Sequence, residues 1–315
     1  MTLDAAWRRP LKVGLYLPTF DQPWMQTSAP RWGDLLDAAR HAEAVGFDSL
    51  WIPDHLHIRD DAGGHLGVWE GWSLLAALAA VTDRVELGSL VVSTAFRNPA
   101  LLAKMVDTID EISGGRFVLG LGAGWHEPEF RAFGHPFDHR VARFAEALTI
   151  IAGLLRQGHM DFEGTYFQVH DCELRPRGPR PQGPPILVGA EGPRMLCLAA
   201  QHADAWGRDF DRVNPDLVPY SPEDLAAWGP RVDAACAEVG RDPTTLERTA
   251  AVFVDLPGAT GREGWNALAG SSEELAEGLR TYAHAGFTHV QLWLEPSTLD
   301  GIEAFAPVLE LLDRA

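Results

Sequence analysis

The sequence is poor in the features that mark several classes of protein. It has three cysteines, Cys172, Cys197 and Cys236, far apart and without a Cys-x-x-Cys pair. Neither a disulfide framework nor a cysteine-based zinc site is indicated, so we expect three free thiols. Basic residues are also scarce, with 26 Lys and Arg against 44 Asp and Glu, which gives a formal net charge of -18. This charge argues against nucleic acid as a partner, although a helix terminus with a few local cations can still hold a phosphate.

Long apolar runs are missing as well. The first residues, MTLDAAWRRPLK, contain no apolar segment of the kind found in secretion signals, and no later run has the length of a membrane span. We therefore expect a cytoplasmic protein with no membrane partner. The chain is nevertheless 46% hydrophobic over 315 residues. One large core, such as a barrel of about 250 residues or more, fits these values better than two small domains.

The hydrophobic pattern alternates between strand-like and helix-like segments. Eight strands are expected near 12–18, 49–55, 85–92, 117–123, 186–190, 204–209, 249–255 and 289–294. Each is followed by a helical pattern, near 33–45, 70–81, 99–112, 140–156, 193–202, 222–239, 272–285 and 300–313. This alternation predicts a single (β/α)8 TIM barrel over residues 1–315, with a hairpin and a proline-rich segment inserted at about 157–185. The longer strand-to-helix connections place the functional site at the carboxyl ends of the strands.

The most informative stretch is 84–137. Asn98-Pro99 gives an N-cap with proline in the first turn, and Gly114-Gly115 ends that helix before the next buried strand. Trp125, His126 and Glu127 follow this strand directly, and we predict a loop over 125–139. His126 and Glu127 are candidates for acid or base catalysis because they come from the catalytic end of a barrel strand.

Asp54-His55 closes the second predicted strand, and His57 follows two residues later. A histidine at this position can act as a general acid or base, or donate a hydrogen bond to a cofactor ring. Two other interpretations remain open: a histidine satisfied by a neighbouring carbonyl, and a metal site of the His-x-His type found in barrel hydrolases. No other strand ends in an obvious set of metal ligands, so we predict no metal.

Two glycine-containing segments could approach a ligand. Gly120, Gly122 and Gly124 resemble a dinucleotide fingerprint, but the predicted loop of about 15 residues after them does not suit one. They indicate either a bare backbone beside a flat ligand or close packing of adjacent strands. The segment from Gly189 to Arg194 precedes a helix, and its amides predict a phosphate cradle, the alternative being a simple turn. Six aromatic residues are candidates for lining a pocket around a planar ring: Trp69, Trp72, Phe96, Trp125, Phe130 and Trp293.

Several blocks resemble the bacterial luciferase-like monooxygenase superfamily. They are AEAVGFDSLWIPDH (42–55), the stretch 97–134 with GGRFVLGLGAGWHEPEF at its centre, PPILVGAEGPRML (184–196), HADAW (202–206) and 271–294. Within this superfamily the sequence is most similar to enzymes that use F420, a 5-deazaflavin, in place of FMN. The resemblance implies a (β/α)8 barrel with insertions, usually a homodimer.

The resemblance also implies roles for single residues. Asp54 and His55 match the pair beside the reactive edge of the ring, where the histidine assists proton transfer. Leu90-Val91 match a bulge with a non-prolyl cis peptide that presses on the central ring. The remaining cofactor-binding positions are the ring-edge backbone at Ala123 and Gly124, Trp125 where some members carry a catalytic glutamate, and the phosphate loop Gly189, Ala190, Glu191, Gly192 and Pro193, followed by Arg194.

Together with these patterns, the resemblance implies an F420-dependent oxidoreductase that transfers a hydride to or from an organic substrate. The alternative within the same fold is an FMN-dependent monooxygenase that works with a separate reductase, so a flavin reductase or an F420-reducing enzyme is expected as an indirect partner. A metal-dependent barrel hydrolase and a catalytically silent flavin-binding protein are more remote alternatives. The substrate is not predicted, because the connections 19–32, 56–69 and 210–221 carry no recognisable motif.

Overall fold

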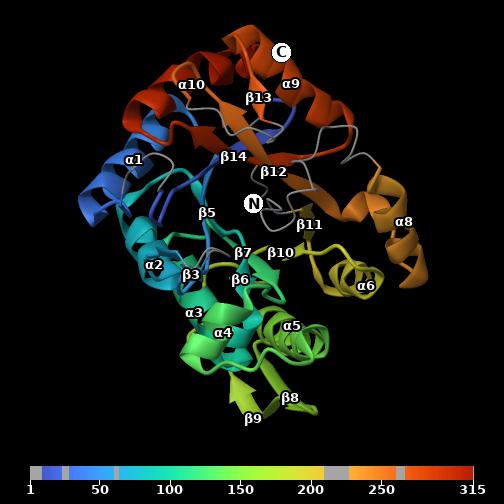
Figure 1. Cartoon of the computed structure of the whole chain (residues 1–315). Coiled ribbons are helices and arrows are strands. Elements are labelled where there is room, and N and C mark those ends of the chain that lie inside the picture. Colours follow the sequence, from blue (N-terminus) through green and yellow to red (C-terminus); the bar gives the residue numbers. More distant parts are fainter. Residues whose placement is uncertain (1–8, 23–27, 60–63, 209–226, 260–266, 315) are drawn as a thin grey trace.

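The strands form a closed parallel barrel. The computed structural model describes residues 9–22, 28–59, 64–208, 227–259 and 267–314 (Figure 1). Eight strands pair side by side around the ring, and the pairing of β7 with β10 closes it. In ring order they are β1 (Lys12–Tyr16), β2 (Ser49–Ile52), β5 (Glu86–Ser89), β7 (Phe117–Gly122), β10 (Ile186–Gly189), β11 (Ala205–Arg208), β12 (Glu247–Asp255) and β14 (His289–Glu295). The predicted (β/α)8 fold is therefore confirmed.

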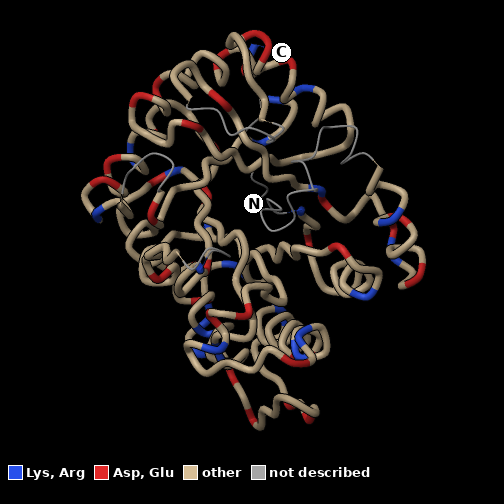
Figure 2. Tube along the Cα trace, viewed as in Figure 1, with Lys and Arg blue, Asp and Glu red and all other residues tan. Residues whose placement is uncertain are grey.

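Helices cover the outside of the barrel (Figure 1). They are α1 (Trp32–Val45), α2 (Gly71–Val81), α3 (Pro99–Ile112), α5 (Arg140–Gln157), α6 (Pro193–His202), α8 (Gly229–Glu238), α9 (Ser272–His284) and α10 (Leu299–Asp313). The predicted helix at 222–239 begins among residues outside the described ranges, and its described part starts at Gly229. Charged residues lie mostly on these outer helices, whereas the strands of the central ring contain few of them (Figure 2). This distribution is expected where a parallel sheet is covered on its outer face and filled within.

Local sequence signals set the bounds of α3. The side chain of Asn98 accepts hydrogen bonds from the backbone N–H groups of Ala100 and Leu101 at 2.9 and 3.2 Å, so it satisfies two otherwise unpaired donors. At the other end Gly114 and Gly115 adopt φ values of 66° and 88°, a region that favours glycine. The helix therefore begins and ends where the sequence predicts.

The third barrel strand is interrupted rather than continuous. The predicted strand 85–92 is divided into β5 and the short β6 (Val92–Ser93), and both pieces pair with β7. Between them the Leu90–Val91 peptide bond is cis, as the family resemblance implied. Outside the ring, residues 157–185 contain the expected hairpin, β8 (His159–Glu163) with β9 (Gln168–Glu173).

The loop predicted for 125–139 was wrong, because it contains helix α4 (Glu127–Phe133). Pro128 stands in its first turn together with two acidic residues, and Gly134 ends it with φ 74°. These are ordinary helix start and stop signals in a very short segment. The loop length was thus a poor argument against a dinucleotide turn; the closed parallel ring excludes a doubly wound sheet instead. Three short strands also occur in expected loops, β3 (Ile58–Arg59), β4 (His65–Leu66) and β13 (Leu268–Ala269).

A polar group lies inside the barrel among its apolar side chains. His289, on β14, is hydrogen-bonded through Nε2 to Ser49 Oγ at 2.7 Å, and Trp51 Nε1 donates to the same oxygen at 2.7 Å. Burial lowers the pKa of His289 from its usual 6.5 to about 3. The folded protein therefore keeps this ring neutral under conditions in which an unfolded chain would protonate it.

The burial of His289 predicts a loss of stability in mild acid. Its contribution is fully present above the unfolded pKa of 6.5 and is lost as pH falls toward about 3, because only the unfolded chain takes up the proton. Each pH unit in this window costs about 1.4 kcal/mol. Between about pH 6.5 and about pH 5, the free energy of unfolding should therefore fall by about 2 kcal/mol more in the wild type than in His289→Gln. Urea unfolding at both pH values measures this difference. An equal fall in the free energy of unfolding in the two proteins would contradict the prediction.

Candidate functional site

The candidate residues after β2 and those after β7 lie close together at the carboxyl ends of these strands. His55 follows β2, Trp125 follows β7, and their rings contact edge to face with centroids 5.6 Å apart. Trp125 also contacts the ring of His126, with centroids 4.9 Å apart. The side chain of His55 is 20% exposed and Trp125 is 44% exposed. The structure thus brings both residues together at the catalytic end of the barrel, within reach of a ligand.

A buried carboxylate that the sequence analysis missed lies behind His55. Glu129, on α4, accepts a hydrogen bond from His55 Nδ1 at 3.0 Å and another from the backbone N–H of Leu56 at 3.0 Å. Its side chain is 2% exposed. The signal was present, because Glu129 lies in the EPEF segment directly after a barrel strand. A loop over 125–139, as predicted, gives no reason to place this carboxylate behind His55.

Asp54 is buried and bound to an arginine, whereas its neighbour His55 is partly exposed. Arg97 donates to both of its carboxyl oxygens, at 2.7 and 2.9 Å, and to Glu70 at 2.7 Å. Burial raises the pKa of the Asp54 carboxyl, and the hydrogen bonds from Arg97 oppose that shift. Glu70 also caps α2 by accepting from the N–H groups of Trp72 and Ser73. This network joins the end of β2 to the starts of α2 and α3.

His126 and Glu127 make contacts of a different kind. His126 Nε2 accepts a hydrogen bond from the backbone N–H of Arg59 at 3.0 Å, and burial lowers the pKa of its ring. Glu127 is exposed and forms an ion pair with Arg131 one helical turn later, at 2.8 Å. His126 therefore supports the neighbouring β3 segment, and Glu127 faces the surface of α4. Of the three catalytic candidates, His55 is the one whose side chain is best placed to act on a ligand.

The three glycines Gly120, Gly122 and Gly124 allow neighbouring segments of the chain to pack closely against β7 and the residues after it. A Cβ atom at Gly120 would overlap the carbonyl oxygen of Ser89, and one at Gly122 would lie 2.8 Å from a methyl group of Val91. At Gly124, where φ is 76°, a Cβ would lie 2.5 Å from the Phe130 ring. Close packing of adjacent segments, the alternative given above, explains these glycines. Their glycine character is thus no evidence for a flat ligand.

The segment from Gly189 to Arg194 leads into the amino end of α6. Gly192 is the N-cap and gives no side-chain cap, and residues 191–194 are exposed. Pro193 has no N–H, so the available donors are the amides of Glu191, Gly192 and Arg194. Arg208, at the end of β11, was not predicted. Its buried guanidinium forms an ion pair with Glu191 at 3.0 Å and lies 4.3 Å from the Trp228 ring centroid. The uncapped helix end suits an anionic group.

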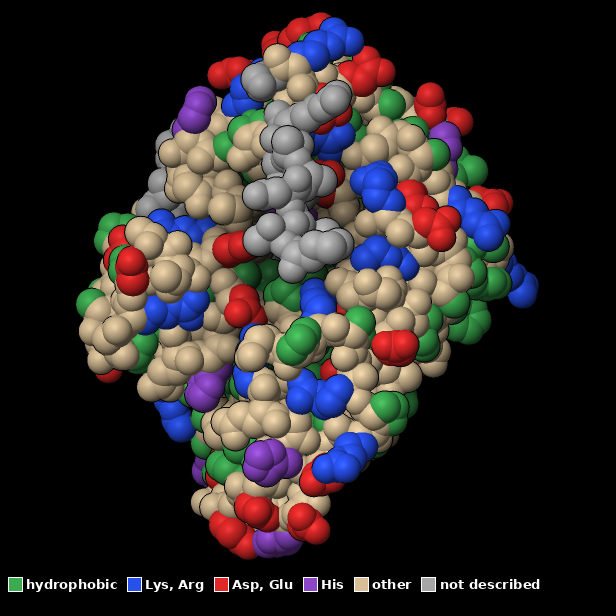
Figure 3. All heavy atoms as spheres, turned by 180° about the vertical axis from the view of Figure 1, so that it is seen from behind, with side chains coloured by type: hydrophobic (Ala, Val, Ile, Leu, Met, Phe, Trp, Pro, Cys, Tyr) green, Lys and Arg blue, Asp and Glu red, His purple; other side chains and the backbone are tan. Residues whose placement is uncertain are grey.

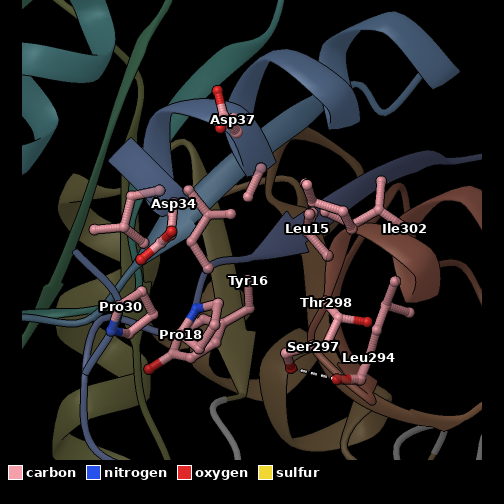
Figure 4. A pocket seen from close by; sticks show the side chains of 14 residues that line it. Leu15, Tyr16, Pro18, Pro30, Asp34, Asp37, Leu294, Ser297, Thr298 and Ile302 are labelled. Atoms are coloured by element: carbon pink, nitrogen blue, oxygen red, sulfur yellow. Dashed lines mark hydrogen bonds between the residues drawn. The ribbon is translucent and has the colours of Figure 1, made fainter. Parts of the chain in front are cut away.

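The aromatic candidates do not form one pocket. Trp72, Phe96, Phe130 and Trp293 are buried in the core, whereas Trp69 and Trp125 are exposed. A cavity of about 170 Å³ opens elsewhere, between α1 and α10, and Tyr16, Asp34 and Thr298 are among its lining residues (Figure 4). None of the predicted site residues lines it.

Other sequence predictions can be compared with the part of the chain that the structure describes. The three cysteines are free. Within the described ranges, no group of three or more His, Cys, Asp or Glu side chains is placed to hold a metal ion, and no helix is long and apolar enough to cross a membrane. Acidic and basic side chains are intermixed on the face seen in Figure 3.

A closed parallel barrel with paired titratable groups at the carboxyl ends of its strands has the architecture of a barrel enzyme. The family model for luciferase-like monooxygenases matches residues 11–256. The chain belongs to this family and is an oxidoreductase.

Two curated relatives differ in the activity that their names give. The chain is 30% identical over 309 residues to an F420-dependent glucose-6-phosphate dehydrogenase of Intrasporangium calvum, covering 84% of this chain and 90% of that protein. It is 30% identical over 257 residues to the pyrimidine monooxygenase RutA of Cronobacter turicensis, covering 76% of this chain and 64% of that protein. The chain thus spans less than two thirds of the RutA sequence.

Solved structures support the fold. An F420-dependent secondary alcohol dehydrogenase, in complex with an F420-acetone adduct, superposes with a TM-score of 0.78 at 20% identity, covering 96% of this chain and 99% of that one. The long-chain alkane monooxygenase LadA gives a TM-score of 0.77 at 15% identity, covering 96% of this chain and 91% of that one. At these identities the likeness concerns the barrel alone.

Proposed function

We propose that the protein is an F420-dependent oxidoreductase that transfers a hydride between the deazaflavin and an organic substrate. One observation carries this proposal: the chain matches an enzyme named as an F420-dependent dehydrogenase over 90% of that enzyme's length. The residues at the strand ends suit such a cofactor. In this proposal the amides at the start of α6 bind its phosphate, and Leu90, Val91, Ala123 and Gly124 lie along the ring.

The chemistry divides between cofactor and protein. When bound, the deazaflavin supplies two-electron hydride chemistry, because carbon replaces the N5 nitrogen of a flavin and the ring then disfavours the one-electron steps that oxygen activation needs. The protein has to orient the substrate and move a proton. His55 is the proposed proton-transfer residue, since its ring lies at the mouth of the barrel against the exposed Trp125. His126 and Glu127 stay weaker candidates because of the contacts described above.

A second function is an FMN-dependent monooxygenase supplied by a separate reductase. The similarity to RutA, 30% identical over 76% of this chain, favours it. The same histidine and the same helix terminus would serve an FMN phosphate and ring. A homodimer, and a reductase or F420-reducing enzyme as indirect partner, stay predictions under either function.

We expect the protein to bind F420 more tightly than FMN. The dissociation constant for F420 should be in the low micromolar range or better, which corresponds to about 8 kcal/mol of binding free energy. Tryptophan fluorescence can report the titration, because the chain has 11 tryptophans and Trp125 lies at the site. The same deazaflavin without its phosphate is the matched control, and we expect it to bind more weakly. Equal or tighter binding of FMN, together with oxygen-dependent turnover, would support the monooxygenase instead.

A further inference from the structure

The contacts of Glu129 determine which nitrogen of His55 carries a proton. A carboxylate can only accept hydrogen bonds, and the backbone N–H of Leu56 can only donate one. Glu129 Oε2 accepts from that N–H at 3.0 Å, while Oε1 lies 3.0 Å from His55 Nδ1. The Nδ1 atom must therefore be the donor in this contact. In a neutral imidazole the proton is then on Nδ1, and Nε2 has a lone pair.

The surroundings hold the ring in this state. Glu129 is 2% exposed, so water does not readily replace the His55 ring as its partner. Trp125 packs edge to face against the same ring from the other strand end. Among the described residues, none is hydrogen-bonded to His55 Nε2. The ring is thus fixed on one edge and open on the other.

We infer that Glu129 is a positioning residue that fixes the tautomer of His55, so that Nε2 is the atom that accepts or returns the substrate proton. The reaction in which His55 takes part rests on the proposed function. The position of the proton on the ring does not, because it follows from the contacts of Glu129. Glu129 does not itself touch the substrate. It acts through His55, as a buried carboxylate does when it orients a catalytic imidazole in other enzymes.

Replacing Glu129 by glutamine reverses the arrangement. The carboxamide oxygen has to stay on the Leu56 N–H, because two donors cannot face each other. The NH2 group then faces His55 Nδ1, which becomes an acceptor, and the proton moves to Nε2. Glu129→Gln keeps the size of the side chain but converts the reactive nitrogen from a base into a donor.

The test measures the proton position and turnover in the same variants. In ¹⁵N NMR of the protein without cofactor, we expect His55 to carry its proton on Nδ1 in the wild type and on Nε2 in Glu129→Gln. Turnover with the cofactor that binds should fall by at least about 100-fold in the variant, the usual contribution of a positioned acid or base. The affinity for that cofactor should be unchanged.

Glu43→Gln is the matched control. The Glu43 carboxylate also binds backbone N–H groups, those of Asp83, Arg84 and Val85, but within the described ranges it is hydrogen-bonded to no histidine. This variant should keep the His55 tautomer and wild-type turnover, whatever its effect on stability.

Three results would overturn the inference. The first is a wild-type His55 ring with its proton on Nε2, which is decisive even if Glu129→Gln fails to fold. The second is an unchanged tautomer in a folded variant. The third is a switched tautomer with turnover within about threefold of the wild type. Failure of the F420 proposal is distinguishable, because it would appear in the ligand titration and leave the NMR result intact.

Discussion

Replacing His55 by alanine should lower turnover by at least about 100-fold, with cofactor affinity and melting temperature little changed. The reason is its position: the ring follows β2 at the catalytic end of the barrel and is partly exposed, and among the described residues only its Nδ1 nitrogen is hydrogen-bonded, to Glu129. The variant removes the proposed proton-transfer group but leaves the core intact. Steady-state kinetics, ligand titration and thermal unfolding of one preparation measure the three quantities.

His170→Ala is the control for His55→Ala. This histidine lies on the exposed β8–β9 hairpin, where it pairs with Glu163 at 3.3 Å. It should leave all three quantities unchanged. Unfolding of His55→Ala would make His55 a core histidine, and normal turnover in a folded variant would remove it from the mechanism.

Replacing Arg97 by methionine should lower the free energy of unfolding by about 3–5 kcal/mol, because it leaves Asp54 buried without its partner. The Asp54 side chain is 2% exposed and both of its oxygens accept from Arg97. Adding Asp54→Asn should recover part of the loss, since the double variant buries no carboxylate. Urea unfolding of the two variants and the wild type measures both changes.

An exposed arginine gives the comparison for Arg97. Arg131 pairs with Glu127 on the surface of α4, with side chains 78% and 51% exposed. Arg131→Met should change stability by less than about 1 kcal/mol. If Arg97→Met also lowered the free energy of unfolding by less than about 1 kcal/mol, Asp54 would tolerate burial without an arginine.

Local patterns in the sequence predicted most of the barrel. Asn98-Pro99 and Gly114-Gly115 mark α3 because capping and left-handed backbone depend on neighbouring residues alone. The same rules describe α4, yet its 7 residues are too few to show a helical period, and start and stop signals without a period do not predict a helix.

The candidate site was less predictable because its contacts join distant parts of the chain. Asp54 meets Arg97 across 43 positions, and His55 meets Glu129 across 74. No local pattern shows which of many charged residues will be neighbours in the folded barrel. The strand-end position and the family resemblance both indicated His55, and the resemblance implied the cis bond at Leu90–Val91, but neither gave the partners that hold this histidine.

The glycines of β7 affect how this enzyme can be altered. At Gly120 and Gly122 any larger residue would displace the backbone of Ser89 or the side chain of Val91, so these positions tolerate almost no substitution. Phe133 and Trp69, by contrast, are 52% and 49% exposed in the connections that follow β7 and β2. Substitutions at such outer positions remove no contact between β5 and β7, so they leave the closure of the ring intact.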